Sequence, residues 1–256
     1  MKKIITLIIL CTALTATVSA QTDDTQAKKI AVKARIGYSI GGTAPIGLPA
    51  TIRKIEAYRL TPSLLVGADV AFAFDKRWGL MTGLHFENKA MNADAATKAY
   101  RMEVVKGDSK IEGLFTGHVK QKVTEWMFTL PIEATLALSR KVTLKAGPYF
   151  SLLVSKKFDG IAADGYIRQN DPTGPRINMG DKEGEWATYD FSEDMRNLQM
   201  GIAAGVDWQL HRNIGLSADV NWGLTGIFKK DFKTVEQTLY PIYGTIGVFY
   251  RLNTRR

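Results

Sequence analysis

Apolar residues alternate with small or polar residues in eight segments of this chain, and in each segment the apolar residues occupy the even-numbered positions. Successive side chains of a strand point to opposite faces, so this period of two gives each segment one apolar face and one mixed face. Each segment also exceeds the ~9–11 residues that a tilted strand needs to cross a bilayer. The pattern predicts strands over residues 29–41, 63–75, 78–89, 122–138, 142–155, 197–210, 214–226 and 238–252.

The connections between these segments alternate between short and long. Three tight turns span 75–77, 139–141 and 211–213, whereas the connections that begin near Gly42, Lys89, Lys156 and Ile227 are long. In membrane barrels the short turns face the periplasm and the long loops face outward. We therefore predict an all-β fold, an eight-stranded antiparallel up-and-down transmembrane β-barrel with long outer loops and with both termini on the periplasmic side.

The N-terminus has the three regions of a secretory signal. A basic start at 1–3 precedes an apolar run over 4–14, and small residues at 18–20 precede Gln21. Cys11, the one cysteine, lies inside this segment, so the mature chain is expected to contain no disulfide. No later window holds the ~18 apolar residues of a transmembrane helix. The expected organisation is a signal peptide over 1–20, a short periplasmic segment over 21–28 and one barrel domain over 29–256, in the outer membrane of a Gram-negative cell.

The formal net charge is +9, from 34 basic and 25 acidic residues, and loss of Lys2 and Lys3 with the signal peptide leaves +7. A basic balance can indicate nucleic-acid binding. Here the basic residues are scattered through turns and loops and the protein is expected to be exported, so we expect no nucleic-acid partner. Acidic headgroups of outer-membrane lipids are the expected neighbours.

Aromatic residues gather near the two ends of the predicted strands, as in the aromatic girdles of membrane barrels. Those at the periplasmic ends are Phe72, Phe74, Trp78, Trp208 and Tyr250, and those toward the opposite rim are Tyr38, Phe86, Trp126, Phe128, Trp222 and Tyr240.

The odd-numbered positions predict what fills the barrel. Eight strands enclose an interior that side chains can fill, so no open pore is expected. Charges removed from water need partners, and the register places Asp69 diagonal to His85 and Glu133 diagonal to Lys145. We predict an ion-pair network in the lumen, formed by Lys33, Arg35, Asp69, His85, Glu87, Glu125, Glu133, Lys145, Asp207, Asp219 and Arg251.

Two of the long connections differ in character. Weak alternation over 99–105 and 114–123 predicts that the third and fourth strands continue above the membrane as a tall hairpin. The connection over 156–196 carries nine acidic and six basic residues and is rich in Gly, Asp and Pro. We expect it to be irregular and solvated.

Pro131 and Pro148 are expected side by side in the middle of one hairpin, where each removes a backbone donor from the ladder. One interpretation is a tolerated bulge. The other is a candidate lateral weak point through which an acyl chain could reach the lumen.

The sequence gives little support for a catalytic site or a metal site. The segment Gly37-Tyr38-Ser39-Ile40-Gly41 has the letters of a nucleophile elbow, but it ends a strand instead of joining a strand to a helix. His85 and Glu87 are the candidate partners of Ser39 near the outer rim, although nothing in the sequence fixes that geometry. The three histidines are His85, His118 and His211, which lie far apart in the sequence. We therefore expect no catalytic residues, no metal site and no cofactor.

Several segments resemble the PorT-like outer-membrane β-barrel family. They are Trp-Met-Phe-Thr-Leu-Pro-Ile-Glu from Trp126, Lys-Ala-Gly-Pro-Tyr-Phe-Ser-Leu-Leu from Lys145, the hairpin over 200–226, and Gly41-Gly42-Thr43-Ala44-Pro45 with Ile52-Arg53. The resemblance implies the barrel fold and little about activity, because fold does not determine function.

The sequence thus predicts a structural or interaction role through surface loops, in envelope maintenance or as an accessory to secretion, with envelope or secretion proteins as candidate partners. A lipid-modifying or lipid-binding barrel enzyme is one alternative. A porin-like channel for small solutes is the other, and the charged lumen argues against it.

Overall fold

The computed structural model describes residues 30–45, 47, 49–169, 171–232, 234–235 and 237–252. The predicted signal peptide and N-terminal segment lie outside these described residues. Within them, no helix has both the length and the apolar character needed to span a membrane.

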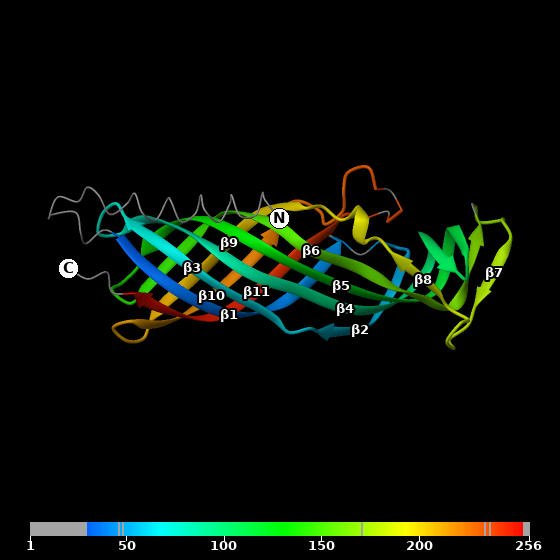
Figure 1. Ribbon diagram of the computed structural model, residues 1–256, viewed down its shortest axis with the longest axis horizontal. Helices are drawn as coiled ribbons and strands as arrows, with labels where there is room; N and C mark the ends of the chain where they lie inside the picture. The colour runs from blue at the N-terminus through cyan, green and yellow to red at the C-terminus, as the bar shows by residue number, and fades with distance from the viewer. Residues whose placement is uncertain are drawn as a thin grey trace.

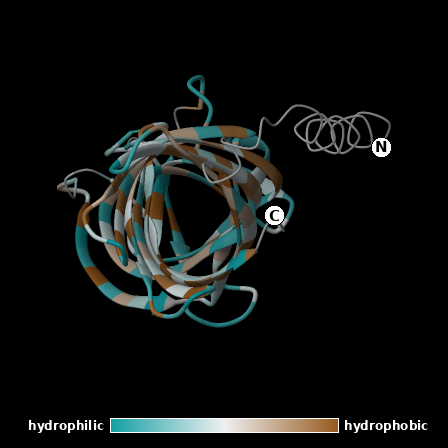
Figure 2. Cartoon of the chain, turned by 90° about the vertical axis from the view of Figure 1, so that its left-hand side faces the viewer, coloured by the Kyte–Doolittle hydropathy of each residue, from teal (hydrophilic) through white to brown (hydrophobic). Residues whose placement is uncertain are grey.

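Eight antiparallel strands close into a ring, which is visible along the barrel axis in Figure 2. The order around the ring is β1-β3-β4-β5-β6-β9-β10-β11, and β1 then pairs with β11 from Val32 opposite Leu252 to Pro45 opposite Leu239. The predicted eight-stranded barrel is therefore confirmed. Three shorter strands lie outside the ring order: β2 pairs with β4, β7 pairs with β6, and β8 pairs with both β4 and β6.

The strands differ greatly in length, as Figure 1 shows. Their bounds are β1 Ile30–Pro45, β2 Ile52–Leu60, β3 Ser63–Ala73, β4 Trp78–Lys106, β5 Ser109–Ala137, β6 Val142–Gln169, β7 Arg176–Met179, β8 Ala187–Asp190, β9 Leu198–Gln209, β10 Ile214–Gly223 and β11 Leu239–Leu252, with a 3₁₀ turn η1 at Ser192–Asp194.

The outer face of the barrel is apolar at the positions that the sequence predicts. Among the described residues, every large apolar side chain exposed on the eight ring strands within the barrel is even-numbered, from Ile36 on β1 to Leu252 on β11. The two odd-numbered exceptions, Ile55 and Val105, lie beyond the barrel. The aromatic residues of the outer rim also pack together across strands: Phe86 stacks on Trp126 with ring centroids 5.3 Å apart.

Three neighbouring strands extend far beyond the other five. β4 and β5 have 29 residues each and β6 has 28, well above the ~9–11 that cross a bilayer. We call the extra part, together with β2, β7 and β8, the outer extension; it comprises 91–106 of β4, 109–123 of β5 and 158–169 of β6. The predicted tall hairpin is confirmed.

The expectation that 156–196 is irregular is wrong over much of its length. β6 continues to Gln169, and β7 and β8 add strands to the same sheet. The physical reason is apolar burial, because Phe158, Tyr189 and Phe191 from this segment pack against one another within the core of the outer extension. Charged residues between these side chains hide the pattern in the sequence.

Two irregularities, one within the outer extension on β4 and one just below it on β6, reverse which residues face inward. On β4 the register shifts between Thr97 and Tyr100, and Ala99 adopts a positive φ of 52°. On β6 the register shifts by one residue at Val154. An extra residue in one strand moves all following side chains to the other face. Even-numbered Met102 and Phe158 are therefore buried, although even positions face outward in the barrel.

The outer extension has an apolar core of its own. Its buried side chains come from the extended parts of β4, β5 and β6, from the small strands, from the segment between β8 and β9, and from the start of β11 and the loop before it. They include Met102, Val104, Ile111, Phe115, Val119, Phe158, Ile167, Met179, Tyr189, Phe191, Met195, Ile227 and Leu239. The end of the barrel that carries this core is called here the loop end.

The opposite end, called here the turn end, carries the three predicted tight turns. The first strand of the ring, β1, begins there, and the last, β11, ends there. In the first turn, Asp75 accepts hydrogen bonds from the backbone amides of Trp78, at 2.7 Å, and Arg77, at 2.6 Å. These bonds hold the pKa of the Asp75 carboxyl below its ordinary value. Short turns face the periplasm in membrane barrels, which places the loop end outside the cell.

Trypsin added to whole cells should cut the chain after Lys182, because this residue is exposed in the turn between β7 and β8. The Arg140-Lys141 turn should remain uncut. The fragments are measured on gels and by mass spectrometry.

A Lys182→Gln variant serves as the matched control and should lose this cut. Cleavage at Arg140 in intact cells, with Lys182 protected, would show that the barrel is inserted the other way round.

Candidate functional site

Arg35 on β1 is the centre of a buried ion-pair cluster in the lumen, with 2 % of its side chain exposed. Its Nε lies 2.9 Å from Oδ2 of Asp69, its Nη1 lies 2.9 Å from Oδ2 of Asp219, and its Nη2 lies 3.3 Å from Oδ1 of Asp207. One guanidinium thus joins carboxylates from β3, β9 and β10, because its planar fork of donors reaches several acceptors at once.

Two lysines and one histidine complete this arginine cluster. Lys33 Nζ lies 2.6 Å from Oδ2 of Asp207, and Lys145 Nζ lies 2.7 Å from Oδ1 of Asp219. His85 Nε2 lies 2.7 Å from Oδ1 of Asp69. The cluster therefore consists of Lys33, Arg35, Asp69, His85, Lys145, Asp207 and Asp219.

Glycines on the neighbouring strands make room for the carboxylates. A Cβ on Gly83 would overlap the side chain of Asp69, and a Cβ on Gly205 would overlap that of Asp219. Both glycines lie directly opposite these aspartates in the ladder. The absence of a Cβ at these two glycines thus lets the Asp69 and Asp219 carboxylates lie close to the neighbouring strand.

A second cluster lies nearer the loop end. Lys89 Nζ is 3.3 Å from Oε1 of Glu87, which also accepts a hydrogen bond of 2.5 Å from the Thr129 hydroxyl. Gln199 donates a hydrogen bond of 2.6 Å to Glu125. The Lys89 ammonium also lies over the rings of Tyr149 and Tyr243, 5.4 and 5.5 Å from their centroids. This glutamate cluster comprises Glu87, Lys89, Glu125, Thr129 and Gln199.

The structure brings together most of the predicted lumen residues but not all of them. Arg251 is exposed at the turn end, and none of the ion pairs found among the described residues includes it. The predicted Glu133–Lys145 pair is wrong: Lys145 turns to Asp219 and Asp207, which offer two carboxylates instead of one. Sequence reasoning also missed Lys89 and Gln199. Both have odd numbers, and this could have placed them in the lumen, because odd-numbered residues of the barrel strands face inward.

The residues considered for nucleophilic chemistry do not meet. The Ser39 hydroxyl hydrogen-bonds to that of Thr245 at 2.8 Å, whereas His85 binds Asp69 and Glu87 binds Lys89. Across the described part of the chain, no group of three or more His, Cys, Asp or Glu side chains is arranged to hold a metal ion.

The ladder is interrupted around Pro131 and Pro148. The β4–β5 register stops at Thr82 opposite Ile132 and resumes at His85 opposite Thr129, and the β5–β6 register skips two positions after Pro131 opposite Tyr149. Neither register shifts across its gap, so the expected bulge is wrong. The prolines are also diagonal neighbours on opposite faces instead of lying side by side. The Thr82 hydroxyl compensates in part by donating a 2.8 Å hydrogen bond to the Pro131 carbonyl.

The sequence profile of one family, described as the outer membrane protein beta-barrel domain, matches residues 19–229. The chain belongs to this family. It is therefore an outer-membrane β-barrel protein of bacteria. Among curated proteins, none matches the sequence.

Solved structures of outer-membrane proteins resemble this family member. The attachment invasion locus protein Ail of Yersinia pestis, in complex with the heparin analogue sucrose octasulfate, is 11 % identical, with 88 % of this chain and 99 % of that chain covered and a TM-score of 0.41. Neisserial surface protein A is 9 % identical over 87 % of this chain and 97 % of that chain, with a TM-score of 0.34. OprG of Pseudomonas aeruginosa is 10 % identical over 88 % and 96 %, with a TM-score of 0.29.

Replacing Arg35 by Met should destabilise this outer-membrane barrel by about 3–5 kcal/mol, because three carboxylates lose their shared cation in a desolvated interior. The free energy of unfolding is measured in urea on the lipid-reconstituted protein by tryptophan fluorescence.

Arg251→Met provides the control, since Arg251 is exposed. It should change the free energy of unfolding by less than about 0.5 kcal/mol. Equal losses in the two variants would mean that the arginine cluster does not stabilise the barrel.

Replacing both prolines by Val should restore ladder hydrogen bonds toward β4 and β5, raising the melting temperature by about 4 °C. If the interrupted ladder also admits lipid chains to the lumen, the lipid that copurifies with the protein should decrease at the same time. If the variant is stabilised but its lipid content is unchanged, the gaps in the ladder do not admit lipid and affect only the shape of the barrel.

Proposed function

We propose that this barrel is a closed membrane anchor that holds a binding structure at the cell surface and acts through interaction, not through transport. The observation that carries the proposal is the outer extension: strands β4, β5 and β6 continue well beyond the membrane and enclose a separate apolar core. A membrane anchor alone needs no such structure. Ordered surface elements on a rigid scaffold are where binding residues are commonly found.

The filling of the lumen supports a closed barrel. The arginine and glutamate clusters occupy successive levels of the interior, and a cavity of only about 30 Å³ lies among Arg35, His85, Glu87 and Glu133. Such a cavity has room for only about one or two water molecules. A porin-like channel for small solutes is thus the weaker alternative, and steady single-channel conductance would favour it.

The expected partners follow from the compartment. We propose outer-membrane lipids around the barrel, envelope or secretion proteins at the outer extension, and no nucleic acid. The motifs from Trp126 and Lys145 support a place in the PorT-like branch of the family, with an accessory role in secretion or envelope maintenance, and with export directed by a cleaved N-terminal signal peptide.

A lipid-modifying enzyme remains the alternative from a different class. The interrupted ladder at Pro131 and Pro148 offers a place where a lipid chain could enter. The separation of Ser39 from both His85 and Glu87 speaks against a serine nucleophile there. We therefore propose no catalytic residues.

In-cell photocrosslinking tests the proposal. A photoreactive phenylalanine analogue placed at Val105 or Ile55, which are 40 % and 49 % exposed on the outer extension, should form discrete higher-mass adducts on irradiation of intact cells. The adducts are detected on immunoblots of this protein.

The control position is Lys141 in a turn at the turn end, which should give no such adduct. Crosslinks from Lys141 without crosslinks from Val105 or Ile55 would contradict an interaction role for the outer extension.

A further inference from the structure

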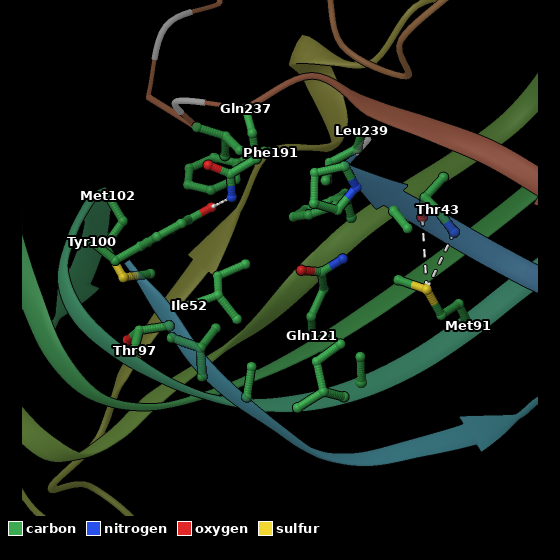
Figure 3. A pocket seen from close by; sticks show the side chains of 18 of the residues that line it. Thr43, Ile52, Met91, Thr97, Tyr100, Met102, Gln121, Phe191, Gln237 and Leu239 are labelled. Carbon is green, nitrogen blue, oxygen red and sulfur yellow. Dashed lines mark hydrogen bonds between the residues drawn. The ribbon is translucent and has the colours of Figure 1, made fainter. Parts of the chain in front are cut away.

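The core of the outer extension is hollow beside its junction with the barrel. A cavity of about 270 Å³ opens there, lined by residues of β1, β2, β4, β5, β6, β8 and β11 and of the loop before β11. Figure 3 shows Met91, Ile52 and Leu239 around this space. We call it the outer pocket. Its size suits a small molecule, since an apolar cavity of about 150 Å³ already binds benzene.

The lining of the outer pocket is apolar and carries no charge. Met91, Met102, Val119, Phe158 and Leu239 are among its apolar lining residues, and no Asp, Glu, Lys, Arg or His is among the described residues that line it. A charged ligand would lose its hydration without gaining a partner, at a high cost in free energy. The lining therefore selects an uncharged ligand with an apolar body.

Two amides give the outer pocket polar contacts. Gln121 of β5 points into the space in Figure 3, and no described residue hydrogen-bonds to its side chain. Gln237 donates a 2.9 Å hydrogen bond to the Tyr100 hydroxyl, while its own Oε1 is buried and finds no partner among the described residues. A buried acceptor without a partner is costly. A ligand that carries a hydroxyl or amide N–H would satisfy it.

The floor of the outer pocket is closed toward the membrane. Met91 lines the pocket, and two residues earlier on the same face of β4 Lys89 packs between Tyr149 and Tyr243 in the glutamate cluster. An apolar ligand that reached this level would have to cross two layers of buried charge to go further. The outer pocket is therefore a place of binding and not the entrance of a path through the barrel.

From these observations we infer that the outer pocket binds a small uncharged amphiphile, an apolar or aromatic body with one hydrogen-bonding group such as a hydroxyl. The inference rests on the proposed surface-binding role and specifies a ligand class for it. The apolar body lies against Met91, Met102 and Phe158, and the polar group lies between Gln121 and Gln237. Such a ligand enters from the loop end, and it leaves the same way.

Binding of 4-propylphenol to the full protein in lipid nanodiscs tests the inference, with calorimetry as the measurement and empty nanodiscs as the correction for partitioning. The protein should show one saturable site. Ala93→Phe places a ring in the outer pocket and should weaken binding by about tenfold or more. Ala96→Phe is the matched control on the same strand, because Ala96 is not among the lining residues, and it should bind as the unmodified protein does.

A second comparison tests the polar contact. Gln121→Leu should weaken binding of 4-propylphenol by about fivefold and leave binding of propylbenzene unchanged, because only the phenol loses a hydrogen bond. Circular dichroism confirms that each variant is folded.

Uptake that is not saturable, equal binding by the Ala93→Phe and Ala96→Phe variants, or a phospholipid that fills the pocket and blocks the phenol would each overturn the inference. The crosslink expected at Val105, which does not line the outer pocket, reports on the proposed surface role separately, so failure of the pocket leaves that test intact.

Discussion

Backbone amides and carbonyls inside a hydrocarbon layer have no water to bind, so each must find a partner within the protein. A sheet meets this demand only when its edges are joined, and here the joint is the pairing of β1 with β11. Closure in turn fixes the number of strands, the alternation of outward and inward side chains, and the width of the interior. The even-numbered apolar residues of the sequence are the visible result of this constraint.

The interior created by closure is narrow and low in dielectric, and the chain fills it with charges that neutralise one another. Arg35 serves three aspartates from three strands, and glycines opposite two of these aspartates let the carboxylates lie close to the wall. Above this layer the character of the interior changes. The glutamate cluster gives way within two residues of β4 to the apolar outer pocket, so the polarity of the interior falls from the membrane toward the cell surface.

The sequence allowed the barrel to be predicted because lipid imposes a strict period of two on every crossing strand. The tall hairpin could also be predicted, from weak alternation in residues 99–105 and 114–123. The strands β2, β7 and β8 could not. β7 and β8 have only four residues each, and the pairing of β2 with β4 is broken by two register shifts, so none of them gives a long alternating run. The side chains of Met102 and Phe158 point inward because of the irregularities at Ala99 and Val154. No pattern in the neighbouring residues predicts these irregularities. The lumen residues were largely identifiable by position, but the choice of partner by Lys145 depends on distances across three strands, which the register of neighbouring strands cannot give.

The seam between β1 and β11 joins residues from the two ends of the chain, such as Val32 and Leu252. Contacts of such long sequence separation form slowly, because the loop entropy is lost before the contact is gained. Until the last strand arrives, β1 presents an unpaired edge, and such edges are prone to pair with other chains. The pairing of β1 with β11 is thus the costliest contact of the ring to close, and an open sheet leaves these two edges available to other strands. The β4–β5 hairpin, which pairs neighbouring segments, can by contrast form at any earlier time and serve as the template on which the remaining strands are added.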